Sequence, residues 1–307
     1  MGGFVIQTRN LSKKFKSQYA VNSLNMSVKK GDIYGLIGKN GAGKTTFIRL
    51  IMGLIYPTEG EIAMWGESSE TALLEGRKRV GSIIETPAFH PNMNAKQNLE
   101  MVRLQRGIQG KDCIDRCLKD VGLEDTGSKK ASRFSLGMKQ RLAIGAALIS
   151  DPEMLILDEP VNGLDPIGIV EIRELLKKIN RERGVTILIS SHILSEVYQM
   201  ATCYGIMHKG ELIEELTMYE LNNKSRKYLQ ITVDDASKAA VVIEREFGTT
   251  NFEILPGSKI HLYDRTDNPG EVNRILNTNR IVVESIQLMG EDLEAYFLKS
   301  VGGTGNV

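Results

Sequence analysis

The fold of this chain is decided by the stretch GKNGAGKT at residues 38–45. It matches the pattern G-x-x-x-x-G-K-T and lies between a predicted strand that ends at Ile37 and a helical run that begins near Thr45. Glycines in this setting let backbone N–H groups converge on phosphate oxygens at the N-terminus of a helix. The stretch therefore predicts a loop that binds the phosphates of a nucleotide.

Side chains of this loop have predicted roles of their own. Lys44 places a positive charge near the β and γ phosphates, and the hydroxyl of Thr45 is a ligand for Mg²⁺. The residues expected to contact the nucleotide here are Gly38, Asn40, Gly41, Ala42, Gly43, Lys44, Thr45 and Thr46. A nucleotide and Mg²⁺ are therefore the expected ligands.

Outside the loop, short β-branched runs alternate with longer helical patterns from Phe4 to about Tyr219. The predicted strands are Ile33–Ile37, Val80–Ile84, Met154–Leu157 and Thr186–Ser190. The last three are nearly continuous apolar runs, which predicts central strands covered on both faces. Residues Glu171–Asn180 place apolar side chains at helical spacing and predict a surface helix. The alternation predicts an α/β domain with a largely parallel sheet.

The pattern changes after about Asn222. The elements predicted beyond this point are strand Tyr228–Val233, helix Ala236–Phe247, strands Phe252–Leu255 and Lys259–Tyr263, helix Glu271–Leu276 and strand Ile281–Leu288. This is the element order of a ferredoxin-like unit. The polar stretch Asn222–Lys227 is the predicted linker, so we expect domains at residues 1–221 and 222–307. A final amphipathic helix is predicted at Glu291–Leu298.

Composition excludes several classes of protein. Of the 307 residues, 41% are hydrophobic and 25% are charged, close to the average of soluble globular proteins. The chain has no apolar run of about 18 residues, so we expect no membrane-spanning helix in it. Lysine and arginine total 39 against 38 acidic residues, a balance that predicts no nucleic-acid partner.

A pair of carboxylates follows one of the buried strands. The strand that begins at Met154 is followed by Asp158 and Glu159, and ligands of open α/β sheets bind at the carboxyl ends of strands. In phosphoryl transfer the metal ligand and the group that orients water must differ, because a carboxylate bound to Mg²⁺ is a poor base. We therefore expect Asp158 to hold the metal and Glu159 to polarise the water. Without the phosphate loop upstream, the pair would indicate only a solvated strand end.

Four further motifs follow the phosphate loop along the chain. They are Ser135–Arg141 (SLGMKQR), Leu157–Pro160 (LDEP), Asn162–Asp165 (NGLD) and Ser190–His192 (SSH). With the phosphate loop they cover roughly residues 4–217, and over this region the chain resembles the ATP-binding-cassette ATPases, which carry these motifs in the same order. The resemblance implies ATP as the nucleotide. It also implies a nucleotide-binding domain with a mixed sheet core, an antiparallel β subdomain and a helical subdomain at about residues 86–150.

In this family Ser135–Arg141 corresponds to the signature motif. The resemblance implies that the signature motif of one subunit closes on ATP held by another, in a head-to-tail dimer. Ser135 and Gly137 would contact the nucleotide across this interface, since a hydroxyl and N–H groups at the start of a helix attract an anion. Asp165 would cross between the sites, and His192 would hydrogen-bond the γ-phosphate. The partner in the dimer is either an identical chain or a sister ATPase.

An aromatic ring and a carboxylate complete the expected site. Phe15 lies where the family places a ring that stacks on adenine, and Tyr19 is the second candidate, although an aromatic in an N-terminal β-ribbon can also simply belong to the core. Glu85 stands where most relatives carry a glutamine that touches Mg²⁺ and the attacking water. A carboxylate adds negative charge beside the metal, so Glu85 is a candidate metal ligand and catalytic residue.

Glu85, the signature SLGM and the residues Thr86–Phe89 make the chain similar to the bacitracin and lantibiotic immunity group of transporter ATPases. The resemblance implies a subunit that hydrolyses ATP to drive a separate integral membrane subunit, exporting an antimicrobial peptide or a hydrophobic drug from a bacterial cell. The segment Pro87–Leu104 would receive a helix of that subunit. With no secretion signal at its start, the chain is expected at the cytoplasmic face of the membrane. The expected catalytic residues are Glu159, His192, Lys44 and Glu85.

Other functions share some of these features. A non-transport ATPase acting on translation or DNA would resemble tandem cassettes or heads with long coiled coils, whereas this chain has one phosphate loop, no heptad run and no basic patch. A nucleotide-binding scaffold without turnover would not need both Glu159 and His192. The C-terminal domain carries no catalytic cluster, and its expected role is either that of an accessory without a ligand or a regulatory or dimer-supporting one.

Overall fold

The structure, a computed structural model, describes residues 3–85, 89–290 and 293–302. The chain forms two compact units: residues 219–299 make up the second unit, and the rest of the chain belongs to the first. The first unit contains a six-stranded and a three-stranded sheet, and the second contains a four-stranded sheet. Each unit has its own buried apolar core.

The first unit is built around a six-stranded sheet in the order β5-β6-β7-β3-β8-β9. Its strands are β3 (Ile33–Ile37), β5 (Val80–Ile83), β6 (Met154–Asp158), β7 (Thr186–Ser191), β8 (Cys203–His208) and β9 (Glu211–Thr217). Neighbours from β5 to β8 run parallel, and β9 pairs antiparallel with β8. Every residue of β3, β6 and β7 is buried, which explains their continuous apolar sequences.

The expectation that all three apolar runs form central strands was wrong for β5, which lies at an edge of the sheet. The residues of β5 are nevertheless largely buried, because helix α5 (Leu136–Leu148) packs against the strand. At Gly81 this approach is so close that an added Cβ would lie 2.2 Å from the backbone oxygen of Ala147. An edge strand covered by a helix therefore has the same apolar sequence as a central one.

An antiparallel sheet in the order β2-β1-β4 supplies the second layer of the first unit. Its strands are β1 (Phe4–Phe15), β2 (Gln18–Lys29) and β4 (Glu59–Met64). Side chains such as Ile6 and Val21 share one core with Leu36 of β3 and Phe47 of α1 (Lys44–Ile51). Helix α2 (Glu70–Lys78) follows β4. The antiparallel sheet thus holds α1, and with it the phosphate loop, against the central sheet.

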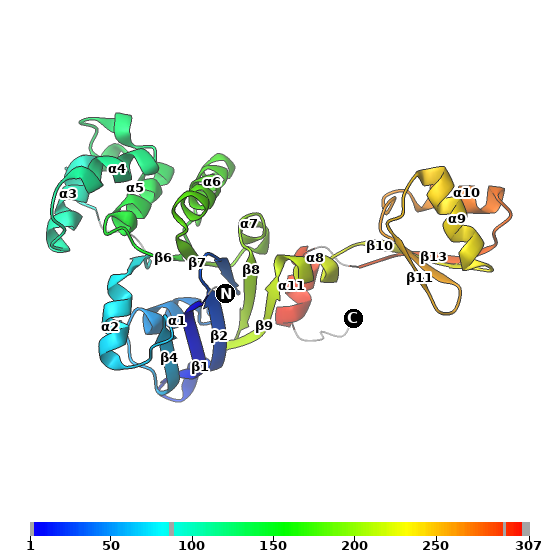
Figure 1. Ribbon diagram of the computed structural model, residues 1–307, viewed down its shortest axis with the longest axis horizontal. Helices are drawn as coiled ribbons and strands as arrows, with labels where there is room; N and C mark the ends of the chain where they lie inside the picture. Colours follow the sequence, from blue (N-terminus) through cyan, green and yellow to red (C-terminus); the bar gives the residue numbers. More distant parts are fainter. Residues whose placement is uncertain (1–2, 86–88, 291–292, 303–307) are drawn as a thin grey trace. The chain divides into compact units, whose positions relative to one another are not determined.

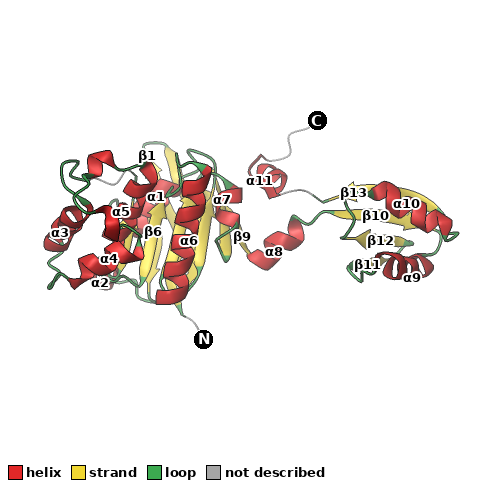
Figure 2. Cartoon of the chain, turned by 90° about the horizontal axis from the view of Figure 1, so that it is seen from above, coloured by secondary structure: helices red, strands yellow, loops and turns green. Residues whose placement is uncertain are grey.

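The helical part of the first unit consists of α3 (Ala95–Gln105), α4 (Asp112–Asp120) and α5, which pack against one another (Figure 1). Short 3₁₀ turns at Glu124–Thr126 and Ala131–Arg133 connect α4 to α5. The predicted surface helix lies within the longer α6 (Pro166–Arg183), which runs along the central sheet in Figure 2. The short α7 (Leu194–Tyr198) follows β7.

The second unit has a four-stranded antiparallel sheet in the order β11-β12-β10-β13. Its elements are β10 (Tyr228–Val233), α9 (Ala236–Phe247), β11 (Phe252–Leu255), β12 (Lys259–Leu262), α10 (Pro269–Thr278) and β13 (Val283–Met289). Leu229, Ile231 and Val233 alternate along β10 and face both helices, which lie on one side of the sheet (Figure 1). The predicted ferredoxin-like order of elements is confirmed.

The segments around the unit boundary differ from the expectation. Helix α8 (Met218–Lys224) takes in the first half of the stretch Asn222–Lys227 that the sequence marks as a linker. Polar composition misled this interpretation, because the solvated face of a helix has the same composition as a linker. The last helix, α11, spans Leu293–Gly302, whereas the expected start at Glu291 lies outside the described residues.

Candidate nucleotide site

The phosphate loop connects β3 to α1, as its sequence predicts. Gly43 caps α1 with a φ of 108°, in the left-handed region that favours glycine. A Cβ at this position would lie 2.2 Å from the backbone oxygen of Ala20, so the hairpin of β1 and β2 leaves no room for a side chain. Glycine is therefore required here by both conformation and space, and the backbone N–H groups that follow lie at a helix N-terminus.

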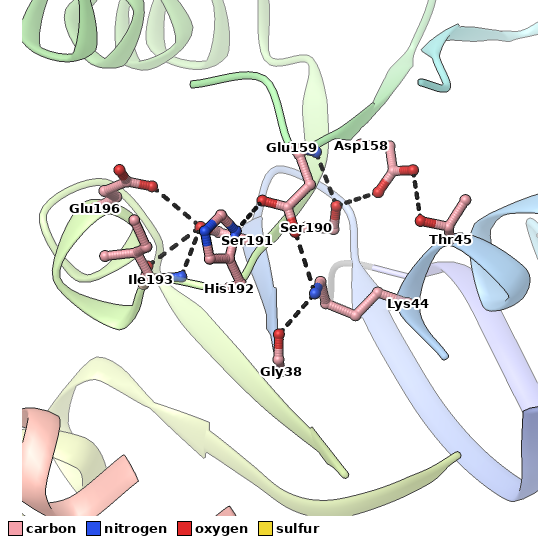
Figure 3. Close-up of polar contacts among 10 residues, drawn as sticks. All are labelled: Gly38, Lys44, Thr45, Asp158, Glu159, Ser190, Ser191, His192, Ile193 and Glu196. Atoms are coloured by element: carbon pink, nitrogen blue, oxygen red, sulfur yellow. Dashed lines mark hydrogen bonds and ion pairs between the residues drawn. The ribbon is translucent and has the colours of Figure 1, made fainter. Parts of the chain in front are cut away.

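Lys44 is the buried cation of this loop, with only 6% of its side chain exposed. Its Nζ donates a hydrogen bond to the backbone oxygen of Gly38 at 2.6 Å and lies 3.1 Å from Oε1 of Glu159 (Figure 3). Burying a charge is costly unless it is paired and hydrogen-bonded. The carboxylate of Glu159 therefore compensates the ammonium group of Lys44 in this arrangement.

Asp158 lies between hydroxyl groups from different elements. Oγ1 of Thr45 donates to its Oδ2 at 2.8 Å, and Oγ of Ser190 donates to its Oδ1 at 2.5 Å (Figure 3). Asp158 and Ser190 are register partners in the parallel pair of β6 and β7. The sheet order thus brings the phosphate loop and the carboxyl ends of β6 and β7 together.

The hydroxyl of Thr45 and the carboxylate of Asp158 fit a magnesium ion. Mg²⁺ binds through one or two carboxylates together with waters and phosphate oxygens rather than in an all-protein cage. Among the described residues, no group of three or more His, Cys, Asp and Glu side chains is placed to hold a metal. Thr45 and Asp158 therefore have the chemistry of a site that is completed by a phosphate ligand.

His192 is joined to the same carboxylate as Lys44. Its Nδ1 lies 2.8 Å from Oε2 of Glu159, so the two oxygens of Glu159 have different partners (Figure 3). Ser191 holds the loop that carries the histidine: its hydroxyl accepts from the backbone N–H of Ile193 at 3.0 Å and donates to Oε2 of Glu196 at 3.1 Å. Burial raises the pKa of the Glu196 carboxyl above its usual value.

The signature motif and the loop after β6 line a separate cavity of about 730 Å³. Ser135 caps α5 by accepting from the backbone N–H of Met138 at 3.2 Å, and a Cβ at Gly137 would meet open space. Asp165 caps α6 by accepting from the backbone N–H of Gly168 at 3.0 Å. The signature motif and Asp165 therefore lie at the N-termini of two helices that line one cavity. The capping role of the Asp165 carboxylate was not predicted from the sequence.

Aromatic candidates for adenine stacking lie at the hairpin of β1 and β2. The ring of Phe15 is 51% exposed with Nζ of Lys13 above it, 5.2 Å from the centroid. Tyr19 is less exposed, at 36%, and has Nζ of Lys14 4.9 Å from its centroid. Neither ring belongs to the buried core, and each has a lysine ammonium group above one face.

The remaining predicted site residues are placed as follows. Asn40 is exposed, Ala42 is buried, and Thr46 is half-buried in the first turn of α1. Glu85 forms an ion pair with Arg49 of α1 and keeps 61% of its side chain exposed. Within the described residues, Glu85 therefore pairs with a helix that begins at the phosphate loop, rather than with Asp158 or Thr45.

Known proteins resemble the chain along nearly its whole length. Residues 21–162 match the ABC transporter family. Bacitracin transport ATP-binding protein BcrA of Enterococcus faecalis is 44% identical over 302 residues, with 98% of each chain covered. The chain belongs to the ATP-binding proteins of ABC transporters. Lantibiotic transport ATP-binding protein SrtF of Streptococcus pyogenes is 42% identical over 211 residues, covering 69% of this chain and 90% of its own.

Solved structures of ATP-binding cassettes share the fold of the first unit. One is a dimeric cassette in a post-hydrolysis state with ADP and phosphate, which is 26% identical with a TM-score of 0.62 and covers 69% of this chain and 98% of its own. This ABC transporter protein is accordingly an ATPase that binds ATP. Along the part of the chain that the structure describes, no helix has the length and apolar character needed to cross a bilayer.

One residue of this ABC ATPase had no predicted role of its own. Ser190 belongs to the SSH motif, yet only the structure joins its hydroxyl to Asp158 and to the backbone N–H of Glu159. A signal was present, since Ser190 is a polar residue that directly follows the apolar run 187–189 in a fully buried strand. Buried hydroxyl groups have hydrogen-bond partners. The identity of those partners depends on which strand lies beside β7.

Proposed function

We propose that the chain is the ATP-hydrolysing subunit of an exporter that moves a peptide antibiotic through a separate membrane subunit. The observation that carries this proposal is a set of contacts at the carboxyl ends of the central strands. These contacts bring together Lys44, Asp158, Glu159 and His192. Support for the substrate class comes from the relative BcrA, whose name assigns it to bacitracin transport and which matches this chain over nearly its full length.

The chemistry of hydrolysis follows from the contacts of Glu159. When phosphates bind the loop, they take the place of the Glu159 carboxylate beside Lys44, and the carboxylate is released to accept a proton from the attacking water. His192 then orients Glu159 through its Nδ1 and, with both ring nitrogens protonated, would donate from Nε2 to the γ-phosphate. Lys44 and the backbone N–H groups of the loop stabilise the charge that develops on the phosphate oxygens.

Mg²⁺ would be held by Thr45 and Asp158, with Glu85 as a further candidate, and it would neutralise phosphate charge when bound. The contact of Thr45 with Asp158 supports this assignment, since these oxygens already lie 2.8 Å apart. Phe15, the more exposed ring of the hairpin, would stack on adenine. The other loop residues would bind the phosphates through their backbone: Gly38, Asn40, Gly41, Ala42, Gly43 and Thr46.

A second ATPase chain, either identical or a sister, would complete the site. Among the residues that line the cavity beside the signature motif, Leu136 is 50% exposed and Ile167 71%. Exposed apolar groups of this kind mark protein interfaces. Ser135 and Gly137 would then face the nucleotide of the partner, and closure of the dimer on ATP would transmit force to the transporter.

The surface for the membrane subunit would lie on α3. An apolar cavity of about 430 Å³ is lined there by Met101 and Leu104 of α3 and by Met93 and Ile114 on either side. Leu104 is 63% exposed. The cavity supports the expected segment Pro87–Leu104, of which residues 87–88 lie outside the described residues. Docking of this kind would place the chain at the cytoplasmic face of the membrane.

The test is to purify the chain at native expression from gently solubilised membranes, identify what accompanies it and record the ATPase rate. An integral membrane protein with several helices that changes the rate would support the exporter subunit. Ribosomes or DNA in its place would favour a non-transport ATPase of the same family.

A further inference from the structure

Consecutive serines end β7, and their hydroxyl groups serve different parts of the site. Ser190 turns toward β6 and contacts the carboxylate pair, whereas Ser191 contacts the backbone of Ile193 and the carboxylate of Glu196 (Figure 3). Neighbouring side chains of a strand point to opposite faces. The two serines are therefore not equivalent, and of the two only Ser190 contacts Asp158, the metal ligand of the proposed site.

The hydroxyl of Ser190 is both a donor and an acceptor of hydrogen bonds. Its O–H donates to Oδ1 of Asp158 at 2.5 Å, while its oxygen accepts from the backbone N–H of Glu159 at 2.9 Å. The side chain is fully buried. Because a hydroxyl has a single proton, the N–H of Glu159 directs that proton toward Asp158. The hydrogen bond to Oδ1 leaves Oδ2 of Asp158 facing the hydroxyl of Thr45.

The contact between Ser190 and the Glu159 N–H also constrains the backbone at Glu159. Glu159 has a φ of +50°, in the left-handed region that residues with a side chain seldom adopt. Such a conformation persists only where its surroundings hold it. The bond from the Glu159 N–H to Ser190 holds the backbone at the residue whose carboxylate reaches Lys44 and His192.

We infer that Ser190 is a positioning residue of the ATPase, acting on the metal ligand Asp158 and on the backbone of Glu159. This inference rests on the metal assignment in the proposed function. Groups that hold a metal ligand in place affect metal affinity by about 10–100-fold. Loss of the Ser190 hydroxyl therefore weakens binding of the divalent ion, without removing any group that would contact ion or nucleotide.

The test compares full-length Ser190→Ala with Thr186→Ala. Thr186 is a matched control, since it is equally buried at the other end of β7 and its hydroxyl accepts from the backbone N–H of Gly31 at 3.0 Å. Mn²⁺ binding is measured by electron paramagnetic resonance at saturating ADP, and ADP binding is measured separately in EDTA. We expect Ser190→Ala to weaken Mn²⁺ binding by about 10–100-fold, with ADP binding in EDTA unchanged. Thr186→Ala should match the wild type in both.

Asp158→Asn separates the two proposals. If it loses Mn²⁺ affinity while Ser190→Ala keeps the wild-type value, the role of Ser190 is overturned and the metal assignment stands. If Asp158→Asn also keeps its affinity, the metal assignment is wrong and the inference falls with it. Should Ser190→Ala fail to bind ADP in EDTA, Ser190→Cys replaces it, since a thiol is only a weak donor. Wild-type Mn²⁺ affinity in that variant would equally overturn the role of Ser190.

Discussion

Nζ of Lys44 lies 3.1 Å from Oε1 of Glu159, and the two side chains are 6% and 21% exposed. The cation expected to bind phosphate is thus paired with the carboxylate expected to activate water. Phosphates of an incoming nucleotide must compete with Glu159 for this lysine. The negative charge of Glu159 is therefore expected to oppose nucleotide binding, in addition to its proposed role in hydrolysis.

Glu159→Gln should lower ATP turnover by about 10²–10⁴-fold, because the amide cannot accept the proton of water. The same change should tighten ADP binding, since the competing charge beside Lys44 is removed. Single-turnover hydrolysis and an ADP titration measure the two effects, and gel filtration with ATP should reveal a trapped dimer. Fast hydrolysis by the variant would remove Glu159 from its catalytic role, and unchanged ADP affinity would contradict the competition.

Phe15→Ala should weaken ATP binding by about 1–3 kcal/mol, or about 5- to 150-fold in Kd, through loss of base stacking. Tyr19→Ala is the matched variant, because both rings are exposed on the same hairpin beneath a lysine. Isothermal titration with ATP compares the two. A loss confined to Tyr19→Ala would transfer the adenine site to Tyr19, and no loss in either would exclude the hairpin.

Glu85→Gln should leave nucleotide binding intact and weaken coupling to transport. The ion pair with Arg49 is exposed, at 39% and 61%, so its removal changes the free energy of unfolding by at most about 1 kcal/mol. Antibiotic resistance of cells that carry the variant measures coupling. Arg49→Gln is the control that breaks the same pair and keeps the carboxylate. Unchanged resistance with Glu85→Gln would count against a special role for this residue.

Glu196→Gln should raise the melting temperature near pH 7.5 and have less effect toward pH 4.5. Burial raises the pKa of Glu196 above its ordinary value of 4.5. The protonated carboxyl therefore favours folding below pH 4.5, and that contribution is lost as pH rises through the folded-state pKa. Glutamine stays neutral and keeps an acceptor for Ser191. Differential scanning fluorimetry across this pH range measures the effect. Glu182→Gln is the control, because Glu182 is exposed. Equal behaviour of the two variants would refute the prediction.

Ile231→Ala should destabilise the second unit by about 2–5 kcal/mol, because Ile231 is fully buried in its core. If the two units fold as separate domains, calorimetry should record the loss in one transition, while ATP shifts only the other. Val241→Ala is the control in the same unit, since Val241 is 62% exposed on α9. A single transition that both ATP and Ile231→Ala shift would argue against separate domains.

Local patterns were enough to predict most of the elements. The phosphate loop between β3 and α1 was evident because glycine spacing and helix start are properties of adjacent residues. The β-α-β-β-α-β order of the second unit was also correct, since its strands and helices have distinct periodicities. Element boundaries near polar stretches could not be predicted in this way, as α8 demonstrates, because a solvated helix face and a linker share their composition.

The sequence by itself determined the family, the nucleotide loop and the residue types of the site, because each is encoded in a short motif. Only the tertiary structure decided which of these side chains meet. Thr45 and Asp158 are separated by 113 residues, and Glu159 and His192 by 33. Their contacts depend on β6, β7 and β3 lying side by side, although these strands are not consecutive in that order along the chain. Sheet order is set by burial of the whole core, so no single motif contains it.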